Sequence, residues 1–202
     1  MSLEADFLTS AADKLAENMD RIETCLTGLP PRFLWARDSE NENAVGNLLL
    51  HLEGNVRQWM LSGIGAGPDE RDRPSEFSAR TGANASVLFA KLRGTVGEAL
   101  DLIRSLPHQR LAERVAIQGY DTTVLSAIFH VVEHFSGHTY QIILLTKRFT
   151  GKDLGFYSDL DKSTGLPDAT AGVSRSPADS VAGAGSNDSK RLPTHAVTAR
   201  RT

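Results

Sequence analysis

The chain has 202 residues, 40% of them hydrophobic, and a formal net charge of −3. This size and hydrophobic content suffice for one globular domain with its own core. The near balance of charge argues against nucleic acid as a partner. Cys25 is the only cysteine, which excludes an intrachain disulfide and a cysteine-based zinc cluster and favours a reducing compartment.

The N-terminal segment MSLEADFLTSAADKLAENMD lacks both the basic and the apolar region of a signal peptide. No run of apolar residues approaches the roughly 18 that a membrane span needs. We therefore expect a soluble, cytoplasmic protein that does not contact a membrane.

The first half of the chain predicts two amphipathic helices. Apolar residues recur at helical spacing over residues 3–27, and Gly28 with two following prolines ends the pattern. A second helix is predicted over residues 43–62 and is closed by the glycines of GIGAGP. The polar segment DERDRPSEFSARTG that follows is longer than most connections between helices, so we expect it to be functional or loosely ordered.

The second half predicts two more helices. One runs from about Asn84 to Leu106 and stops at Pro107, and the last begins near an N-cap at Asp121 or Thr122 and reaches Phe149. The connector RVAIQGYD between them has a brief β-like pattern. Four long helices without a convincing strand predict an all-α fold, an antiparallel four-helix bundle, over residues 1–157.

The composition changes after Tyr157. Residues 158–202 contain no aromatic residue and few large apolar ones among many Ser, Gly, Ala, Asp and Pro. Such a segment buries too little apolar surface to offset the entropy of ordering it, so we predict a disordered tail.

The last predicted helix carries three histidines in HVVEHFSGHTYQ, residues 130–141. At 100° per residue, His134 lies about 40° and His138 about 80° from His130, and the apolar stripe of the helix begins near 100°. His138 therefore borders the core, His134 lies one step out, and His130 lies at the rim. Gln141 lies near 20°, in the same sector.

His51 borders the apolar stripe of the second helix in the same way, flanked one turn away on each side by Asn47 and Asn55. Bundles build sites from inward-facing residues of neighbouring helices, so His51 can meet His134 and His138. Three neutral imidazoles with an open position are typical of a catalytic metal site. Asn47, Asn55 and Gln141 would then orient the ligands.

Two other interpretations remain open. Histidines beside an apolar stripe are often structural residues with hydrogen-bonded rings. The letters of His130, Glu133 and His134 also spell H-x-x-E-H, a zinc-peptidase signature in which the glutamate is the general base. Helical phase argues against the peptidase, because Glu133 lies near 300°, on the polar side of the helix.

Several segments together resemble the DinB superfamily, also called the YfiT-like metalloenzymes. They are NLLLHLEGNVRQW at 47–59, PDERDRPSEF at 68–77, IQGYDTTVLSAIFHVVEHFSGHTYQIILLTK at 117–147 and DLGFY at 153–157. The resemblance covers residues 1–157 and is closest to a subfamily of bacterial domains of unknown function. It implies a four-helix bundle that binds a divalent metal through His51, His134 and His138. Members of the superfamily are often homodimers, so the resemblance also implies a homodimer.

The resemblance also suggests an activity. Relatives include transferases and isomerases in which a metal such as zinc lowers the pKa of a small thiol such as bacillithiol or mycothiol. For this chain we expect zinc or nickel first, and manganese or iron next. We therefore expect a thiol-dependent transferase with a small-molecule substrate. A metal-dependent hydrolase and a bundle that binds metal or a partner without catalysis remain as alternatives.

Two arginines in the long loop offer a substrate contact. Arg71 and Arg73 could clamp a carboxylate or phosphate of the substrate at the mouth of the bundle. They could instead pair with Asp69, Glu70 and Asp72 on the surface. Trp35 and Trp59 could likewise serve a dimer interface or the core.

Overall fold

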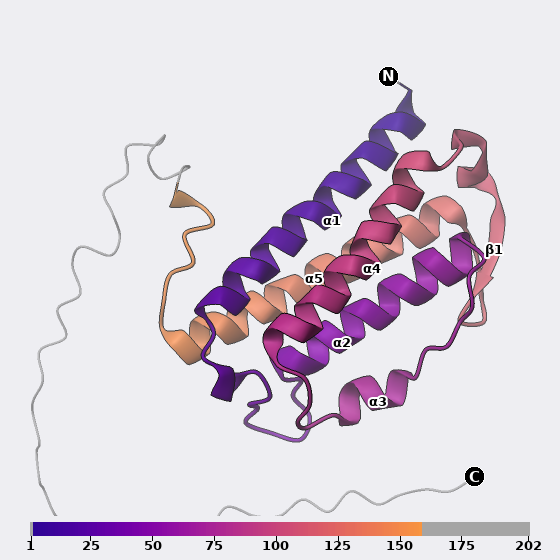
Figure 1. Cartoon of the computed structure of the whole chain (residues 1–202). Coiled ribbons are helices and arrows are strands. Elements are labelled where there is room, and N and C mark those ends of the chain that lie inside the picture. The colour runs from indigo at the N-terminus through magenta and orange to yellow at the C-terminus, as the bar shows by residue number, and fades with distance from the viewer. Residues whose placement is uncertain (1, 159–202) are drawn as a thin grey trace, which may run out of the picture. The chain divides into compact units, whose positions relative to one another are not determined.

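The computed structural model describes residues 2–158, and these form a four-helix bundle with a small hairpin at one end (Figure 1). The predicted all-α fold is confirmed. The predicted tail lies outside the described residues apart from Ser158. No helix of the described residues is long and apolar enough to cross a membrane.

Four long helices make up the bundle: α1 (Leu3–Gly28), α2 (Val45–Val56), α4 (Ala85–Ser105) and α5 (Val124–Thr150). Each packs on two others, so that α1 and α2 lie diagonally opposite, both flanked by α4 and α5. As Figure 1 shows, α1 and α5 run in one direction and α2 and α4 in the other. The long connection between α2 and α4 makes this possible, because it returns the chain along the bundle before α4 begins.

The core lies between the helices, where each contributes an apolar stripe. Its largest fully buried side chains come from all four long helices and include Leu15, Ile22, Leu48, Leu52, Leu92, Ile103, Ile128, Phe135 and Ile142. Trp59 belongs to this core, with 5% of its surface exposed. Trp35 lies flat against Gly46, where a Cβ atom would be 2.8 Å from its ring. Packing thus accounts for both tryptophans.

Side-chain caps explain where the helices begin. Ser2, Asn84 and Thr123 each accept a hydrogen bond from a backbone N–H of the first turn of α1, α4 and α5. Thr123, rather than the predicted Asp121 or Thr122, caps α5 because the preceding residues form a strand. At the other end of α5, Gly151 has a φ of 66°, the left-handed conformation that suits glycine.

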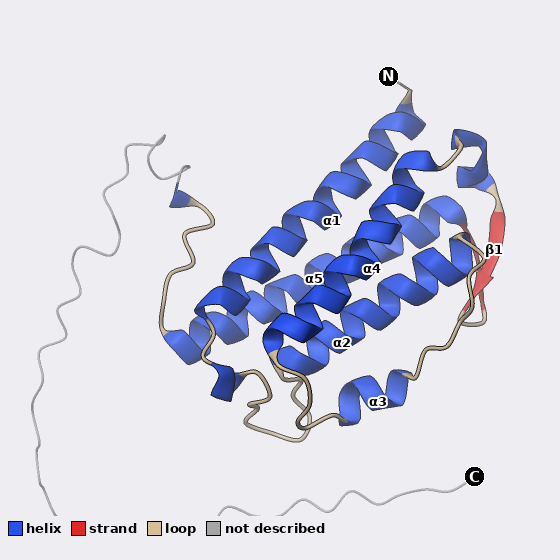
Figure 2. Cartoon of the chain, in the orientation of Figure 1, coloured by secondary structure: helices blue, strands red, loops and turns tan. Residues whose placement is uncertain are grey.

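Three local elements refine the arrangement predicted from the sequence, and the first of them lies where the connector showed a β-like pattern. The connector before α5 is an antiparallel hairpin of β1 (Arg114–Ile117) and β2 (Tyr120–Thr123), coloured red in Figure 2. The long polar loop contains a short helix, α3 (Arg73–Ser78). The second predicted helix changes after Val56 into a π-helix, η2 (Arg57–Ile64), a form often found beside functional sites. Two short 3₁₀ helices, η1 (Pro31–Phe33) and η3 (His108–Ala112), follow α1 and α4.

Candidate metal centre

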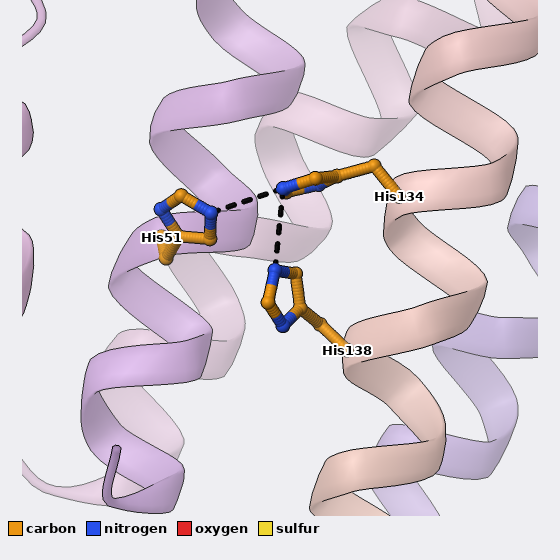
Figure 3. A group of neighbouring side chains, drawn as sticks. All are labelled: His51, His134 and His138. Atoms are coloured by element: carbon orange, nitrogen blue, oxygen red, sulfur yellow. Dashed lines mark hydrogen bonds between the residues drawn. The ribbon is translucent and has the colours of Figure 1, made fainter. Parts of the chain in front are cut away.

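Three histidines from two helices point toward one another in the bundle (Figure 3). The Nε2 atom of His134 lies 3.0 Å from Nε2 of His51 and 3.2 Å from Nε2 of His138. One ring nitrogen from each residue lies within 4.8 Å of the other two. His51 is buried and the α5 histidines are half-buried. The sequence-predicted ligand set is thus brought together as one cluster.

Helix geometry explains the arrangement. His134 and His138 are four residues apart on α5, so their rings project from one face in successive turns. His51 faces them from α2, which packs against α5. The apolar stripes that bury both helices therefore also aim the three rings into the same gap.

A buried carboxylate fixes the orientation of His51. Oε2 of Glu76, from α3, lies 2.8 Å from Nδ1 of His51, and both side chains are more than 90% buried. Arg71 donates to both carboxylate oxygens from Nε at 2.7 Å and Nη2 at 2.9 Å. Burial raises the pKa of Glu76, but these hydrogen bonds and the Arg71 charge outweigh it, so the pKa is lowered. An ionised carboxylate only accepts, so Nδ1 of His51 carries the proton and Nε2 is left with a free lone pair.

Gln141 fixes the orientation of the His138 ring in a similar way. Its Oε1 lies 2.9 Å from Nδ1 of His138 and accepts a hydrogen bond from the N–H there, which again leaves Nε2 free. The predicted orienting role of Gln141 thus has a direct contact to support it. Burial lowers the pKa of His138 more than this hydrogen bond raises it, so the ring favours the neutral form that binds metals.

The positions of the protons on the three rings favour a bound cation. With Nε2 of His51 and His138 both unprotonated, only His134 can supply an N–H, and a single N–H cannot serve both short N···N contacts. At least one contact then opposes two lone pairs. A divalent ion removes this repulsion, and Zn–N bonds of about 2.0–2.1 Å in a tetrahedral site would separate the ligand nitrogens by roughly 3.4 Å. The three residues therefore fit a metal of the zinc type.

His134 also carries the strongest electrostatic perturbation in the cluster. Burial, followed by the neighbouring His138, His51, His130 and Arg71, lowers its pKa to about 3. Its Nδ1 is buried and has no hydrogen-bond partner among residues 2–158. A ring held neutral in this way is ready to donate a lone pair without first losing a proton.

This pKa predicts how the metal-free protein responds to acid. Between pH 6.5 and 3 the unfolded chain binds a proton at His134 that the folded chain does not. Stability is therefore full above pH 6.5 and falls as the pH is lowered, by about 2 kcal/mol from this residue between pH 6.5 and 5. Urea unfolding in EDTA should show this loss, and a smaller one for His134→Asn. Equal losses in both proteins would contradict the assignment.

Asn47 supports the site indirectly. Its Nδ2 donates to the backbone oxygens of Glu76 and Ala79 at 2.9 Å each, and its Oδ1 accepts from Ala44 N–H. Asn47 thereby fixes α3 to the start of α2 and positions Glu76, which in turn orients His51. Asn55 is buried, and its Oδ1 has no hydrogen-bond partner within the described chain, so no contact links it to a ligand.

The two loop arginines are placed differently. The Arg71 side chain is 5% exposed and donates to Glu76 and, through Nη1, to Gln58 at 3.0 Å. Its partner is thus Glu76, not the neighbouring acidic side chains that the sequence suggested. Arg73 is exposed, with its guanidinium carbon 4.9 Å from the centre of the Phe77 ring. Of the two, Arg73 is the one left accessible for the predicted substrate clamp.

His130 lies beside the cluster but outside the ligand set. Its ring centre is 5.5 Å from that of His134 and 4.1 Å from that of Trp59. Burial lowers its pKa despite the opposing effect of Glu133. Glu133 itself is exposed. The short contacts of His134 are to His51 and His138, so the geometry disfavours the H-x-x-E-H interpretation, as helical phase indicated.

Sequence reasoning missed two residues of the site, Glu76 and Gly54. A Cβ atom on Gly54 would lie 2.2 Å from Oε1 of Glu76, so only glycine lets the carboxylate approach α2. The available signal was the start of α3, where Asp72 precedes Pro74 in an N-terminal helix pattern. That pattern predicts an ordered segment in the polar loop and draws attention to the glutamate within it.

Comparison with known proteins gives the chain a family and a structural neighbour. A family model described as "Protein of unknown function (DUF1572)" matches residues 2–158. A crystal structure described as that of a conserved protein from Enterococcus faecalis is similar, with a TM-score of 0.63 at 13% identity. The similarity covers 75% of this chain and 99% of the other, and at this identity it supports the fold alone. No curated protein matches the chain.

Proposed function

The chain belongs to the DUF1572 family, and we propose that it is a divalent-metal-dependent enzyme, built on the DinB or YfiT-like bundle, that acts on small molecules. One observation carries the proposal: three Nε2 atoms converge while Glu76 and Gln141 hold the protons of two rings on the opposite nitrogens. A structural histidine needs no such convergence of lone pairs.

His51, His134 and His138 would hold the ion, with zinc or nickel fitting three imidazoles best and manganese or iron as further candidates. When bound, a divalent cation acts as a Lewis acid and lowers the pKa of a thiol or water. Glu76 maintains the basicity of His51, and Arg71 balances the charge of Glu76. With three protein ligands, a coordination position stays open for a reactant.

Aromatic rings beside the cluster suit a small organic substrate. Phe77 lies 4.6 Å from His51 by ring centres, and Tyr120, which is 64% exposed, lies 6.3 Å by ring centres from the buried Trp59 that contacts His130. Accessible rings such as Phe77 and Tyr120 bind the flat or apolar part of a ligand. Exposed Arg73, beside Phe77, would bind an acidic group of the substrate.

His130 is the residue best placed to move a proton. Its ring is half-buried, adjoins His134, and has a lowered pKa, so an unprotonated nitrogen is available at neutral pH. We assign it the role of accepting the proton of the thiol or water. A thiol-dependent transferase is our first choice, in keeping with the DinB resemblance and with a reducing, cytoplasmic setting.

The transferase assignment predicts a specific assay result. Zinc- or nickel-loaded protein should conjugate an electrophile such as 1-chloro-2,4-dinitrobenzene with at least one of a panel of small thiols, and chelation should abolish the activity. The control is His130→Gln, which should keep the metal and lose rate. Hydrolysis of ester substrates without thiol dependence would instead favour the hydrolase, and bound metal with neither activity would favour a binding protein.

A further inference from the structure

Gln58, in the first turn of the π-helix η2, binds both Arg71 and the loop that carries it. Its Oε1 accepts a hydrogen bond from Nη1 of Arg71 at 3.0 Å, and its Nε2 donates to Oδ2 of Asp69 at 2.7 Å. A guanidinium only donates and an ionised carboxylate only accepts, so the side-chain amide of Gln58 fits this place in one orientation. Asp69 also accepts from the backbone N–H of Arg71 at 3.2 Å. Gln58 and Asp69 together therefore fix the side chain and the backbone of Arg71.

A second donor reaches Gln58 from the β-hairpin. Nε2 of Gln118 donates to the same Oε1 atom, so both lone pairs of that oxygen are used. The hairpin lies against η2 because Ile117 packs onto Gly63, where a Cβ atom would be 2.4 Å from Cδ1 of Ile117. A continuous row of hydrogen-bonded side chains thus runs from the hairpin turn to a histidine of the cluster: Gln118, Gln58, Arg71, Glu76 and His51.

Gln118 adopts a backbone conformation that glutamine disfavours. Ile117 pairs with Tyr120, so Gln118 and Gly119 form a two-residue turn, and their φ angles are 54° and 81°. Such turns favour asparagine followed by glycine, and other residues with a side chain are uncommon at positive φ. Conformations of this kind cluster at functional sites, where surrounding contacts hold them in place. The contact that distinguishes glutamine here is the one to Gln58, which the shorter side chain of asparagine would lose.

The position of Arg71 decides which nitrogen of His51 carries the proton. Nη2 of Arg71 lies 2.9 Å from Oε2 of Glu76 and 3.2 Å from Nδ1 of His51. In this arrangement Nδ1 donates to Glu76, and Nε2 keeps the lone pair that a metal needs. If Arg71 moved toward His51, it would donate to Nδ1, and the ring proton would then lie on Nε2 and block the metal. Gln58 opposes this movement, because it holds Nη1, the guanidinium nitrogen that does not bond Glu76.

We propose that Gln58 is a positioning residue of the metal site: it selects the metal-binding tautomer of His51 through Arg71 and Glu76, with Gln118 as its support. The inference rests on the proposed metal site and adds that the hairpin, which contributes no ligand, acts on a ligand through hydrogen bonds alone. Each group in the row has a fixed role as donor or acceptor, so displacing one of them changes the partner of the next.

Nuclear magnetic resonance of the metal-free protein tests the tautomer directly. Long-range ¹H–¹⁵N spectra at neutral pH should show His51 of the unaltered protein with a protonated Nδ1 and an unprotonated Nε2. In Gln58→Leu the proton should divide between the two nitrogens, because Arg71 is then free to approach Nδ1. The control is Gln109→Leu, which changes an exposed glutamine of η3 and should leave the His51 signals unchanged. An unchanged tautomer in Gln58→Leu would overturn the proposal.

Zinc affinity and thermal stability give a second comparison. Titration against a competing chelator should show affinity weakened about tenfold in Gln58→Leu, the lower end of what loss of a ligand's hydrogen-bond partner causes. Gln118→Asn should weaken it about threefold, as expected for one hydrogen bond. Its melting temperature should stay the same or rise, because asparagine suits the turn.

The outcomes separate this proposal from the metal site itself. Unchanged zinc affinity in both variants, or a fall in affinity of Gln118→Asn only together with a lower melting temperature, would refute the role of Gln58. If the unaltered protein bound no zinc, the proposed function would fail, whereas the tautomer of metal-free His51 would still decide whether Gln58 acts on this ring.

Discussion

Replacing His134 with alanine is expected to remove metal binding almost completely. Its Nε2 lies 3.0 Å from Nε2 of His51 and 3.2 Å from Nε2 of His138, so both short N···N contacts of the cluster are lost with it. Loss of one of three ligands should weaken binding by more than the roughly 10–100-fold that loss of a ligand's hydrogen-bond partner causes. Zinc titration with a competing chelator, on protein purified without a metal-affinity tag, measures the change.

His130→Ala is the matched control, because His130 lies one turn before His134 on the same helix and is similarly half-buried. It should keep one equivalent of metal with near-unchanged affinity. Equal loss of metal in His130→Ala and His134→Ala would mean that the ligand set is assigned incorrectly. Less than about a tenth of an equivalent in the unaltered protein, with no binding on metal addition, would exclude the site altogether.

Gly54→Ala is expected to damage the site although residue 54 touches no histidine nitrogen. The added Cβ would lie 2.2 Å from Oε1 of Glu76 and 3.0 Å from Nε of Arg71, so the carboxylate must move. Glu76 is held in place by its hydrogen bonds to Arg71 and His51, and displacing it releases Nδ1 of His51. We expect metal affinity to fall about 10–100-fold, as for other losses of a ligand's hydrogen-bond partner.

Glycine-to-alanine changes inside helices normally stabilise by up to about 1 kcal/mol, so the sign of the effect is diagnostic. Gly94→Ala, on α4 with open space around its Cβ, should raise the melting temperature and leave metal affinity unchanged. Gly54→Ala should instead lower both. If Gly54→Ala were as stable as Gly94→Ala and bound metal normally, Glu76 would have no part in holding His51.

The clustering of the three histidines was predictable because helical phase is a local property. Each of His51, His134 and His138 borders an apolar stripe, and once two such stripes pack together their edges must meet. Gln141 was predictable for the same reason, since it lies three residues from His138 on the same face. The resemblance to DinB proteins pointed to the same three residues.

The contact of Glu76 with His51 and the burial of Arg71 against Glu76 were not predictable, since both depend on how a polar segment folds back over α2. No apolar periodicity marks a six-residue helix such as α3, and a glycine within a helix does not reveal what approaches it. The π-helix that follows Val56 was not predictable either, because the apolar pattern through Trp59 resembles that of an α-helix.

The position of Glu76 has a consequence for the order of folding. A six-residue helix is too short to persist alone, so α3 becomes ordered only when Asn47, Arg71 and His51 are in place to hold it. Those contacts connect residues up to 29 positions apart, and closing such a loop costs entropy that packed helices must first offset. The bundle should therefore assemble first, with His51 free to rotate and exchange its ring proton. The docking of residues 69–79 then selects a single tautomer as a late step.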